Sequence, residues 1–243
     1  MWSKWIKLCL LSLLISFSLQ QSIVKAEEPL LRVGETLTYK VTIRSIYGGK
    51  QIVKVCSRRR YNGHEVFSIQ SNMETDGLVK TLFKYYEKEE VLVDVNKLYP
   101  LYIKREVGER GKVFIEQVEF NYEAHLAVRR VNYDDGREEK IELKLPGFVQ
   151  DPVTLPFYLR YVNNSQKSIY FYSNGEITSV NYQVALINKN IKTEWNEYSS
   201  YLRFDQPESK ITVMLGSVKE RLPLIIQKIT NLGKVEAKLT KYE

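Results

Sequence analysis

The chain has 243 residues, of which 44% are hydrophobic and 27% are charged, and its formal net charge is +7. A chain of this length can bury a core without covalent staples, so composition gives no reason to expect a disulfide scaffold. The basic excess is small, which argues against a dedicated nucleic-acid binder.

The first 26 residues have the segment order of an export signal. Met1 to Lys7 is short and basic, Leu8 to Leu19 is mainly apolar, and Ala26 is a small residue before an acidic pair. A membrane-spanning helix needs about 20 apolar residues, and this run has 12. Cys9 lies near the start of the run, whereas lipoprotein processing requires a cysteine at its end. We therefore expect cleavage after Ala26 and release into the periplasm.

Cleavage would leave a single β domain at residues 27–243. Three lysines leave with the signal, so the net charge falls from +7 to about +4 by side-chain counting. Cys56 would be the one remaining cysteine, which rules out an intramolecular disulfide. An exported chain without disulfides fits a bacterial envelope better than a eukaryotic secretory pathway.

Most of the mature chain has the alternation of β-strands. Apolar and polar residues alternate over 33–43, 140–145, 210–215 and 234–239, which places one apolar face inward and one charged face in water. Five pairs of turn-forming residues separate such stretches and predict tight hairpins: Gly48-Gly49, Asn62-Gly63, Asp76-Gly77, Asp135-Gly136 and Asn174-Gly175. Their spacing predicts about a dozen antiparallel strands.

Residues 152–162 interrupt this pattern and predict one short helix. Thr154 is a candidate N-cap, and Pro156 lies in the first turn, where its missing N–H costs little. Leu155, Leu159 and Val162 fall on one stripe. The predicted fold is all-β: a large curved antiparallel sheet that forms an open barrel or β-spiral, with this helix packed near its opening.

Three segments resemble a known family. Val33–Tyr39 contains a Gly-Glu followed by alternating apolar positions, Asp151–Arg160 contains an Asp before a Tyr-x-Arg helix, and 221–239 resembles the closing strands. On these segments the chain resembles the exported bacterial family catalogued as domain of unknown function 3108. The resemblance implies a mostly β envelope protein with no established activity. Ile211–Gly216 departs from the pattern because it lacks the expected Trp and Asp, so the resemblance supports no site there.

No set of residues specifies a reaction. His64 and His125 are isolated from each other, and their spacing is not that of zinc ligands. Cys56 has no nearby His and is interpreted as a small strand residue.

The basic run Arg58–Arg60 is either a phosphate or lipid-headgroup site or a solvated strand end. The second interpretation is favoured, because a strand divides such a run between its two faces. Acidic pairs such as Glu89-Glu90 are interpreted as solvated for the same reason. No catalytic residue, metal or cofactor is predicted.

Asp151, Tyr158 and Arg160 are the candidate ligand-binding residues. One hypothesis places them at the mouth of the concave sheet. The favoured alternative is structural, with Asp151 capping the helix and Arg160 docking it through an ion pair.

The sequence therefore leaves two functions open. The first is a binding or carrier protein for a lipid or other apolar ligand on a concave β surface. The second is a structural or envelope-maintenance protein that acts through protein or cell-wall contacts. Neither is an enzyme, and neither involves nucleic acid or a transmembrane span in the mature chain.

Overall fold

The computed structural model describes residues 31–162, 168–194, 196–208, 210–217, 220–231 and 233–243. The predicted export signal at residues 1–26 lies outside the described residues.

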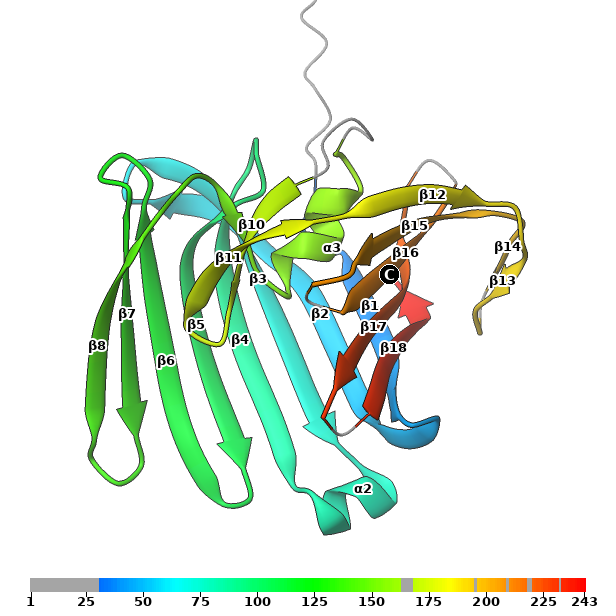
Figure 1. Ribbon diagram of the computed structural model, residues 1–243, viewed down its shortest axis with the longest axis horizontal. Helices are drawn as coiled ribbons and strands as arrows, with labels where there is room; N and C mark the ends of the chain where they lie inside the picture. Colours follow the sequence, from blue (N-terminus) through cyan, green and yellow to red (C-terminus); the bar gives the residue numbers. More distant parts are fainter. Residues whose placement is uncertain (1–30, 163–167, 195, 209, 218–219, 232) are drawn as a thin grey trace, which may run out of the picture.

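One antiparallel sheet of 13 strands dominates the fold (Figure 1). In their order across the sheet the strands are β12 (Gln183–Ile187), β15 (Tyr201–Gln206), β16 (Ile211–Gly216), β17 (Pro223–Thr230), β18 (Gly233–Tyr242), β1 (Thr36–Ile43), β2 (Ile46–Tyr61), β3 (His64–Thr75), β4 (Tyr85–Asp94), β5 (Pro100–Glu109), β6 (Lys112–Asn121), β7 (Leu126–Tyr133) and β8 (Glu138–Lys144). The two outer strands, β12 and β8, are not paired with each other, so the curved sheet is open. This confirms the predicted all-β class.

The remaining elements are short. A second sheet contains β9 (Val149–Gln150), β10 (Ser168–Ser173) and β11 (Glu176–Asn181), and a two-stranded ladder joins β13 (Ile191–Lys192) to β14 (Glu197–Tyr198). The helices among the described residues are α2 (Gly77–Leu82) and α3 (Thr154–Leu159). Figure 1 shows α3, β10 and β11 inside the curve of the main sheet, whereas α2 lies beyond the ends of β3 and β4.

The core lies between the concave face of the main sheet and α3. In β1, Leu37, Tyr39 and Val41 are buried at alternate positions, as their period of two predicts. Phe157 on one side of α3 packs into this cluster. The opposite side of α3 packs into a second cluster, which β10, β11, β15 and β16 complete. The middle of the concave face is therefore filled.

The predicted short helix exists, with narrower bounds than 152–162. Leu155, Leu159 and Val162 share one buried cluster, which confirms the predicted stripe. Val153 rather than Thr154 is the N-cap residue, and its side chain makes no capping hydrogen bond.

Two predicted hairpin turns are wrong. Gly48-Gly49 lies within β2, and the β1–β2 turn is formed by Arg44 and Ser45, whose φ angles are +50° and +67°. Gly49 is required for a different reason, because a Cβ there would clash with the backbone carbonyl of Glu74. The second wrong turn is Asp76-Gly77. There the Asp76 side chain accepts a hydrogen bond from the Gly77 N–H (2.7 Å) and caps α2. A helix replaces a tight turn at this point.

Candidate functional site

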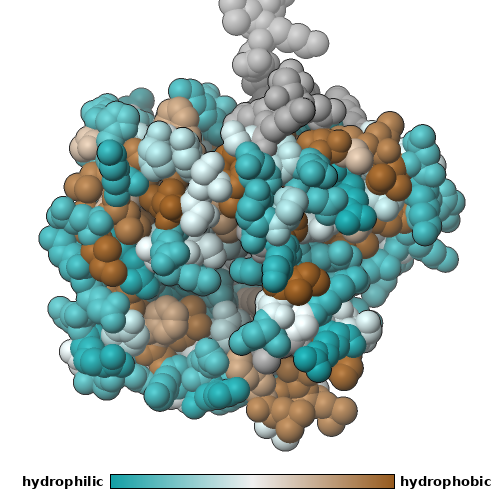
Figure 2. Space-filling view, in the orientation of Figure 1, coloured by the Kyte–Doolittle hydropathy of each residue, from teal (hydrophilic) through white to brown (hydrophobic). Residues whose placement is uncertain are grey.

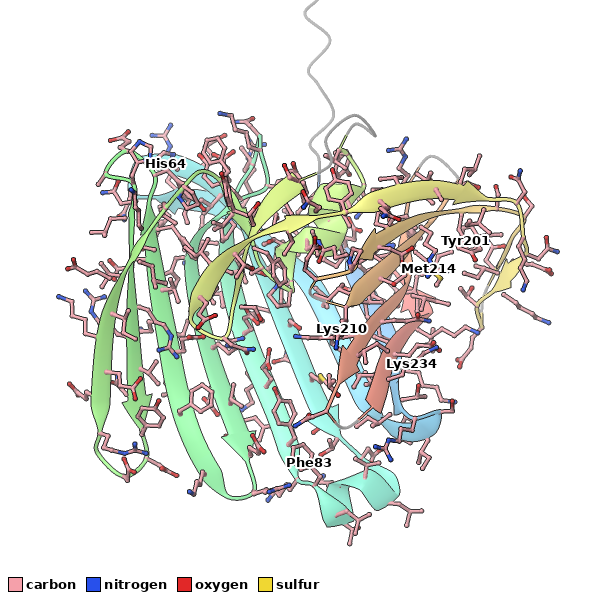
Figure 3. The ribbon with its side chains drawn as sticks, viewed as in Figure 1. His64, Phe83, Tyr201, Lys210, Met214 and Lys234 are labelled. Atoms are coloured by element: carbon pink, nitrogen blue, oxygen red, sulfur yellow. The ribbon has the colours of Figure 1, made fainter. Side chains whose placement is uncertain are left out.

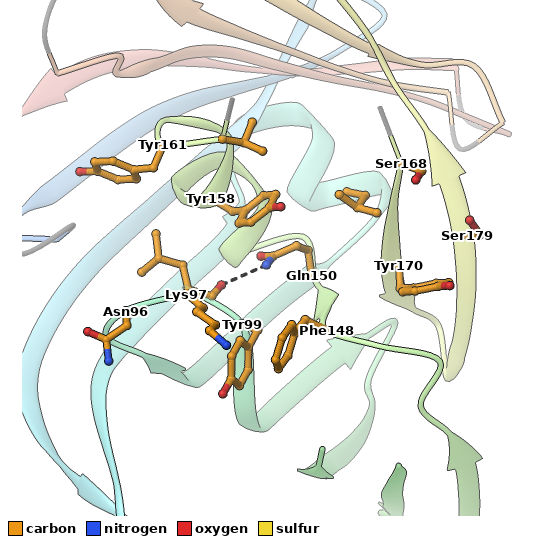
Figure 4. Close-up of a pocket in the computed structure, with 13 residues that line it drawn as sticks. Asn96, Lys97, Tyr99, Phe148, Gln150, Tyr158, Tyr161, Ser168, Tyr170 and Ser179 are labelled. Atoms are coloured by element: carbon orange, nitrogen blue, oxygen red, sulfur yellow. Dashed lines mark hydrogen bonds between the residues drawn. The ribbon is translucent and has the colours of Figure 1, made fainter. Parts of the chain in front are cut away.

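A cavity of about 660 Å³ opens where α3 meets the β4–β5 turn and the small sheet (Figure 4). Its volume falls within the range of roughly 300–1,000 Å³ that small-molecule sites occupy. We call it the rim cavity. Its lining residues are Asn96, Lys97, Leu98, Tyr99, Phe148, Gln150, Tyr158, Tyr161, Val162, Ser168, Ile169, Tyr170 and Ser179.

The β4–β5 turn forms one wall of the rim cavity. The Asp94 carboxylate accepts hydrogen bonds from the N–H groups of Asn96 (2.9 Å) and Lys97 (2.8 Å). Leu98 adopts a positive φ of +57°, and its N–H donates to the Asp94 carbonyl (3.1 Å). These bonds define the conformation of the turn that forms this wall.

Stacked aromatic rings extend this wall. Tyr99 and Phe148 stack with their ring centroids 4.3 Å apart, and Tyr122 packs against both rings at 4.6 and 5.2 Å. The Tyr122 hydroxyl donates to the Pro100 carbonyl (2.9 Å), which fixes the ring. Lys97 holds its ammonium 4.7 Å from the centre of the Phe148 ring. The wall therefore combines an apolar platform with a positive charge at its edge.

The opposite side of the cavity carries more tyrosines and one buried amide. Tyr158 and Tyr161 come from α3 and the residues after it, and Tyr170 comes from β10. Gln150 donates from its amide nitrogen to the Leu98 carbonyl (3.1 Å). Its amide oxygen is buried and has no hydrogen-bond partner within the described part of the chain. The lining thus combines aromatic rings with a few polar groups.

The structure does not bring the three predicted ligand-binding residues together. Tyr158 lines the rim cavity. Asp151 is fully buried, and its carboxylate accepts hydrogen bonds from the N–H groups of Val153 (2.6 Å) and Thr154 (2.9 Å) at the start of α3. Arg160 is buried at the other end of α3, where it pairs with Glu35 at 2.5 Å. Asp151 and Arg160 make the contacts of the structural alternative.

The segments that carry the family resemblance meet at α3. Glu35 belongs to the first segment and Arg160 to the second. Arg160 also donates to the Glu220 carbonyl (3.0 Å), and Arg221, in the third segment, donates to the Arg160 carbonyl (3.3 Å). The three segments of the family resemblance therefore meet in contacts that dock α3 on the sheet.

A buried charge cluster lies on the concave face beyond Asp151. Glu89, Arg105 and Glu116 are opposite one another on β4, β5 and β6, and Arg105 pairs with Glu116. Arg129 pairs with the same carboxylate at 2.5 Å, and the Tyr172 hydroxyl donates to it (2.8 Å). Glu116 is thus held by three partners and ties the small sheet to the main one.

The carboxyl groups of this region have shifted pKa values. Burial raises the pKa of Asp151 to about 6. Burial, followed by the charge of Asp151, also raises the pKa of Glu89. Burial acts in the same direction on Glu116, but Arg105, Arg129 and Tyr172 outweigh it and lower its pKa. One oxygen each of Glu89 and Asp151 is buried without a hydrogen-bond partner among the described residues.

The sequence interpretation missed this cluster. Glu89-Glu90 was expected to be solvated, yet Glu89 is 4% exposed. The alternation of side chains along a strand could have revealed it. Glu89 lies two residues before Val91, so both side chains point toward the core. Glu90, on the other face, pairs with Arg59 at 3.1 Å.

The other residues considered for chemistry have ordinary surroundings. His64 lies exposed at the β2–β3 turn (Figure 3), and His125 lies exposed in the β6–β7 turn. Cys56 is half-buried and donates weakly to the Lys54 carbonyl (3.7 Å). Arg58 pairs with Glu65 at 2.5 Å. The residues that the structure describes contain no group of three or more His, Cys, Asp or Glu side chains placed to hold a metal ion.

Comparison with known proteins defines the family. Residues 38–240 match the family described as "Protein of unknown function (DUF3108)", and the chain belongs to that family. No curated protein matches the sequence.

A solved structure shares the fold. It is the crystal structure of a beta-barrel-like protein of domain of unknown function DUF1849 from Brucella abortus, with a TM-score of 0.54 and 10% sequence identity. The alignment covers 87% of this chain and 97% of that one. At this identity the likeness concerns the fold alone. Neither α2 nor α3 is long and apolar enough to cross a membrane, and no other helix occurs among the described residues.

Proposed function

We propose that this protein is exported to the bacterial envelope and binds a small amphipathic ligand in the rim cavity. The observation that carries the proposal is the lining of that cavity. Four tyrosines and Phe148 give the cavity an aromatic lining that suits an apolar body, such as an acyl chain. Lys97 offers a positive charge to an anionic head group. Binding rather than catalysis is proposed, because the described residues that line the cavity include no His, Asp or Glu that could serve as a general base.

The position of the cavity refines the expectation of a ligand on the concave surface. Helix α3 and strands β9–β11 cover the middle of the concave face and fill it with side chains. The rim cavity is the space left between this filling and the β4–β5 turn. A ligand there would contact α3 through Tyr158, while Asp151 and Arg160 keep the helix in place.

The predicted signal at residues 1–26 supports the envelope location. The sheet supports a single domain over 27–243, because β1 pairs with both β2 and β18 and so joins the two ends of the domain. A folded domain of this kind would carry its ligand after the signal has been removed.

A fluorescent fatty-acid analogue, dansyl-undecanoic acid, tests the proposal. It has an acyl body and an anionic head, so we expect saturable binding with one probe per chain. Ser179→Trp places a bulky ring at the cavity wall and should weaken binding by at least about tenfold. Thr178→Trp, at the adjacent exposed position that does not line the cavity, is the matched control. Absent binding, or equal binding by both variants, would contradict the proposal.

A further inference from the structure

The end of the sheet where α2 connects β3 to β4 exposes apolar side chains. Leu78 is 79% exposed and Leu82 is 86% exposed, and none of the residues of α2 is buried. Ile46 and Tyr47, in the neighbouring β1–β2 hairpin, are also exposed. Figure 2 shows hydrophobic residues gathered at this corner of the molecule. We call these four residues the α2 edge.

Specific contacts hold the α2 edge in place. Asp76 caps the helix, and its own N–H donates to the Gly48 carbonyl (3.0 Å). The Tyr47 hydroxyl lies 3.5 Å from the Asp76 carboxylate. At the base of the α2 segment, the Thr75 hydroxyl donates to the Tyr85 carbonyl (3.1 Å) and accepts from its N–H (3.0 Å). The leucines therefore lie on a helix that is anchored at both ends.

A cationic pocket lies beside the exposed leucines. Its volume is about 410 Å³, and four lysines line it against two glutamates, Glu74 and Glu87. The lysines are Lys50, Lys80, Lys84 and Lys88. Arg110 adds a further positive charge nearby, with its guanidinium 5.2 Å from the centre of the Phe83 ring (Figure 3).

We propose that the α2 edge docks on an anionic phospholipid membrane, with Leu78 and Leu82 in the acyl boundary and the lysine pocket around a lipid phosphate. Exposed leucines next to lysines are the combination that binds membrane surfaces, because burial of apolar area and attraction to anionic headgroups act together. A second copy of the chain fits less well, since two like-charged pockets would face each other. The α2 edge is also small for a stable dimer interface, which buries about 1,200–2,000 Å².

This inference is independent of the rim cavity. Strand β4 begins at Tyr85, beside α2, and ends at Asp94, in the wall of the cavity. Ten extended residues separate the two sites, which corresponds to about 30 Å. A protein docked through the α2 edge would keep the mouth of the rim cavity away from the bilayer surface.

Vesicle co-sedimentation tests the membrane proposal. Protein from cells that express the full chain is mixed with phosphatidylcholine vesicles, with and without phosphatidylglycerol, and its N-terminus is identified by mass spectrometry. We expect binding to the anionic vesicles that weakens as salt is added. The double variant Leu78→Ser/Leu82→Ser should bind at least about tenfold more weakly. Leu186→Ser, which alters a leucine that is 58% exposed on β12, should bind like the wild type.

Hydrogen exchange locates the contact even if another segment also binds lipid. Amides of residues 77–83 should gain protection when anionic vesicles are added, and amides of β12 should not. Binding without protection at 77–83, or equal binding by the double variant, would overturn the proposal. Self-association through the α2 edge without vesicle binding would overturn it as well and would assign the surface to a second copy of the chain.

Discussion

The two helices of the described chain have the same length and opposite surroundings. Each has six residues, and each follows an aspartate that accepts a hydrogen bond from the first N–H groups. In α3, Leu155, Phe157 and Leu159 are buried between two core clusters, whereas α2 buries no residue. A helix this short has little stability of its own. Tertiary contacts therefore decide that α3 fills the sheet and α2 extends from it.

This difference separates residues that maintain the fold from residues that are free to meet a partner. The contacts of α3 connect the Gly-Glu segment, the Asp-to-Arg segment and the closing strands. The leucines of α2 make no such contacts, and their exposed side chains add little to the stability of the fold. We expect stability to be sensitive to changes at α3 and insensitive to changes at α2.

The largest effect should come from breaking the ion pair that docks α3. Glu35→Gln would leave the charge of Arg160 buried and unpaired, which costs about 3–5 kcal/mol of unfolding free energy. Glu65→Gln is the matched control, because Glu65 forms an ion pair of the same length with Arg58 on the surface. Its loss should change the unfolding free energy far less, because solvent screens an exposed ion pair. Urea denaturation measures both, and equal small losses would show that the buried pair does not hold α3.

A leucine-to-alanine pair compares the two helices directly. Leu155→Ala should lower the unfolding free energy by about 2–5 kcal/mol, because it leaves a cavity between packed clusters. Leu82→Ala should change it by less than about 0.5 kcal/mol, because the side chain is already in water. The same denaturation experiment checks the pair. A large loss at Leu82 would mean that α2 packs against something in solution.

A smaller effect should appear as pH dependence. The pKa of Asp151 is raised to about 6 by burial, against roughly 4 in an unfolded chain. Between these values the folded state binds more protons, so stability should increase as the pH falls, by about 1 kcal/mol from pH 7 to pH 5. The raised pKa of Glu89 acts in the same direction. The lowered pKa of Glu116 has the opposite effect, because it makes stability fall as the pH falls, but this effect lies below about pH 5.

The variant Asp151→Asn removes that contribution, together with the part of the Glu89 shift that the charge of Asp151 causes. Asparagine keeps the side-chain oxygen that accepts from the N–H groups of Val153 and Thr154 but cannot ionise. Its unfolding free energy should depend less on pH than that of the wild type between pH 5 and pH 7. Identical pH profiles for the two proteins would contradict the buried, ionisable state of Asp151.

Periodicity predicted the fold well where one face of a strand is buried. Leu37, Tyr39 and Val41 alternate as expected, and the stripe at Leu155 and Leu159 marks α3. Helix α2 was missed because Leu78 and Leu82 face water, so no buried stripe distinguishes it from a turn. The same local residues, Asp followed by Gly, serve a helix cap as well as a hairpin.

The site was harder to predict than the fold. Asp151, Tyr158 and Arg160 are close in sequence, and the sequence indicated correctly that Asp151 and Arg160 suit a cap and an ion pair. The rim cavity draws its walls from five separate segments, and Tyr99 stacks on Phe148, which lies 49 residues away in the chain. Only the pairing of the strands brings those rings together, and local patterns do not encode that pairing.

The mass of the intact, natively folded protein tests the central claim most directly. We expect wild-type protein, purified without organic solvent after expression of the full chain, to carry the excess mass of one small amphipathic molecule. Thr178→Trp should keep this excess mass, and Ser179→Trp should lose it. A wild-type protein of bare polypeptide mass, or an excess mass that Ser179→Trp retains, would contradict a ligand in the rim cavity.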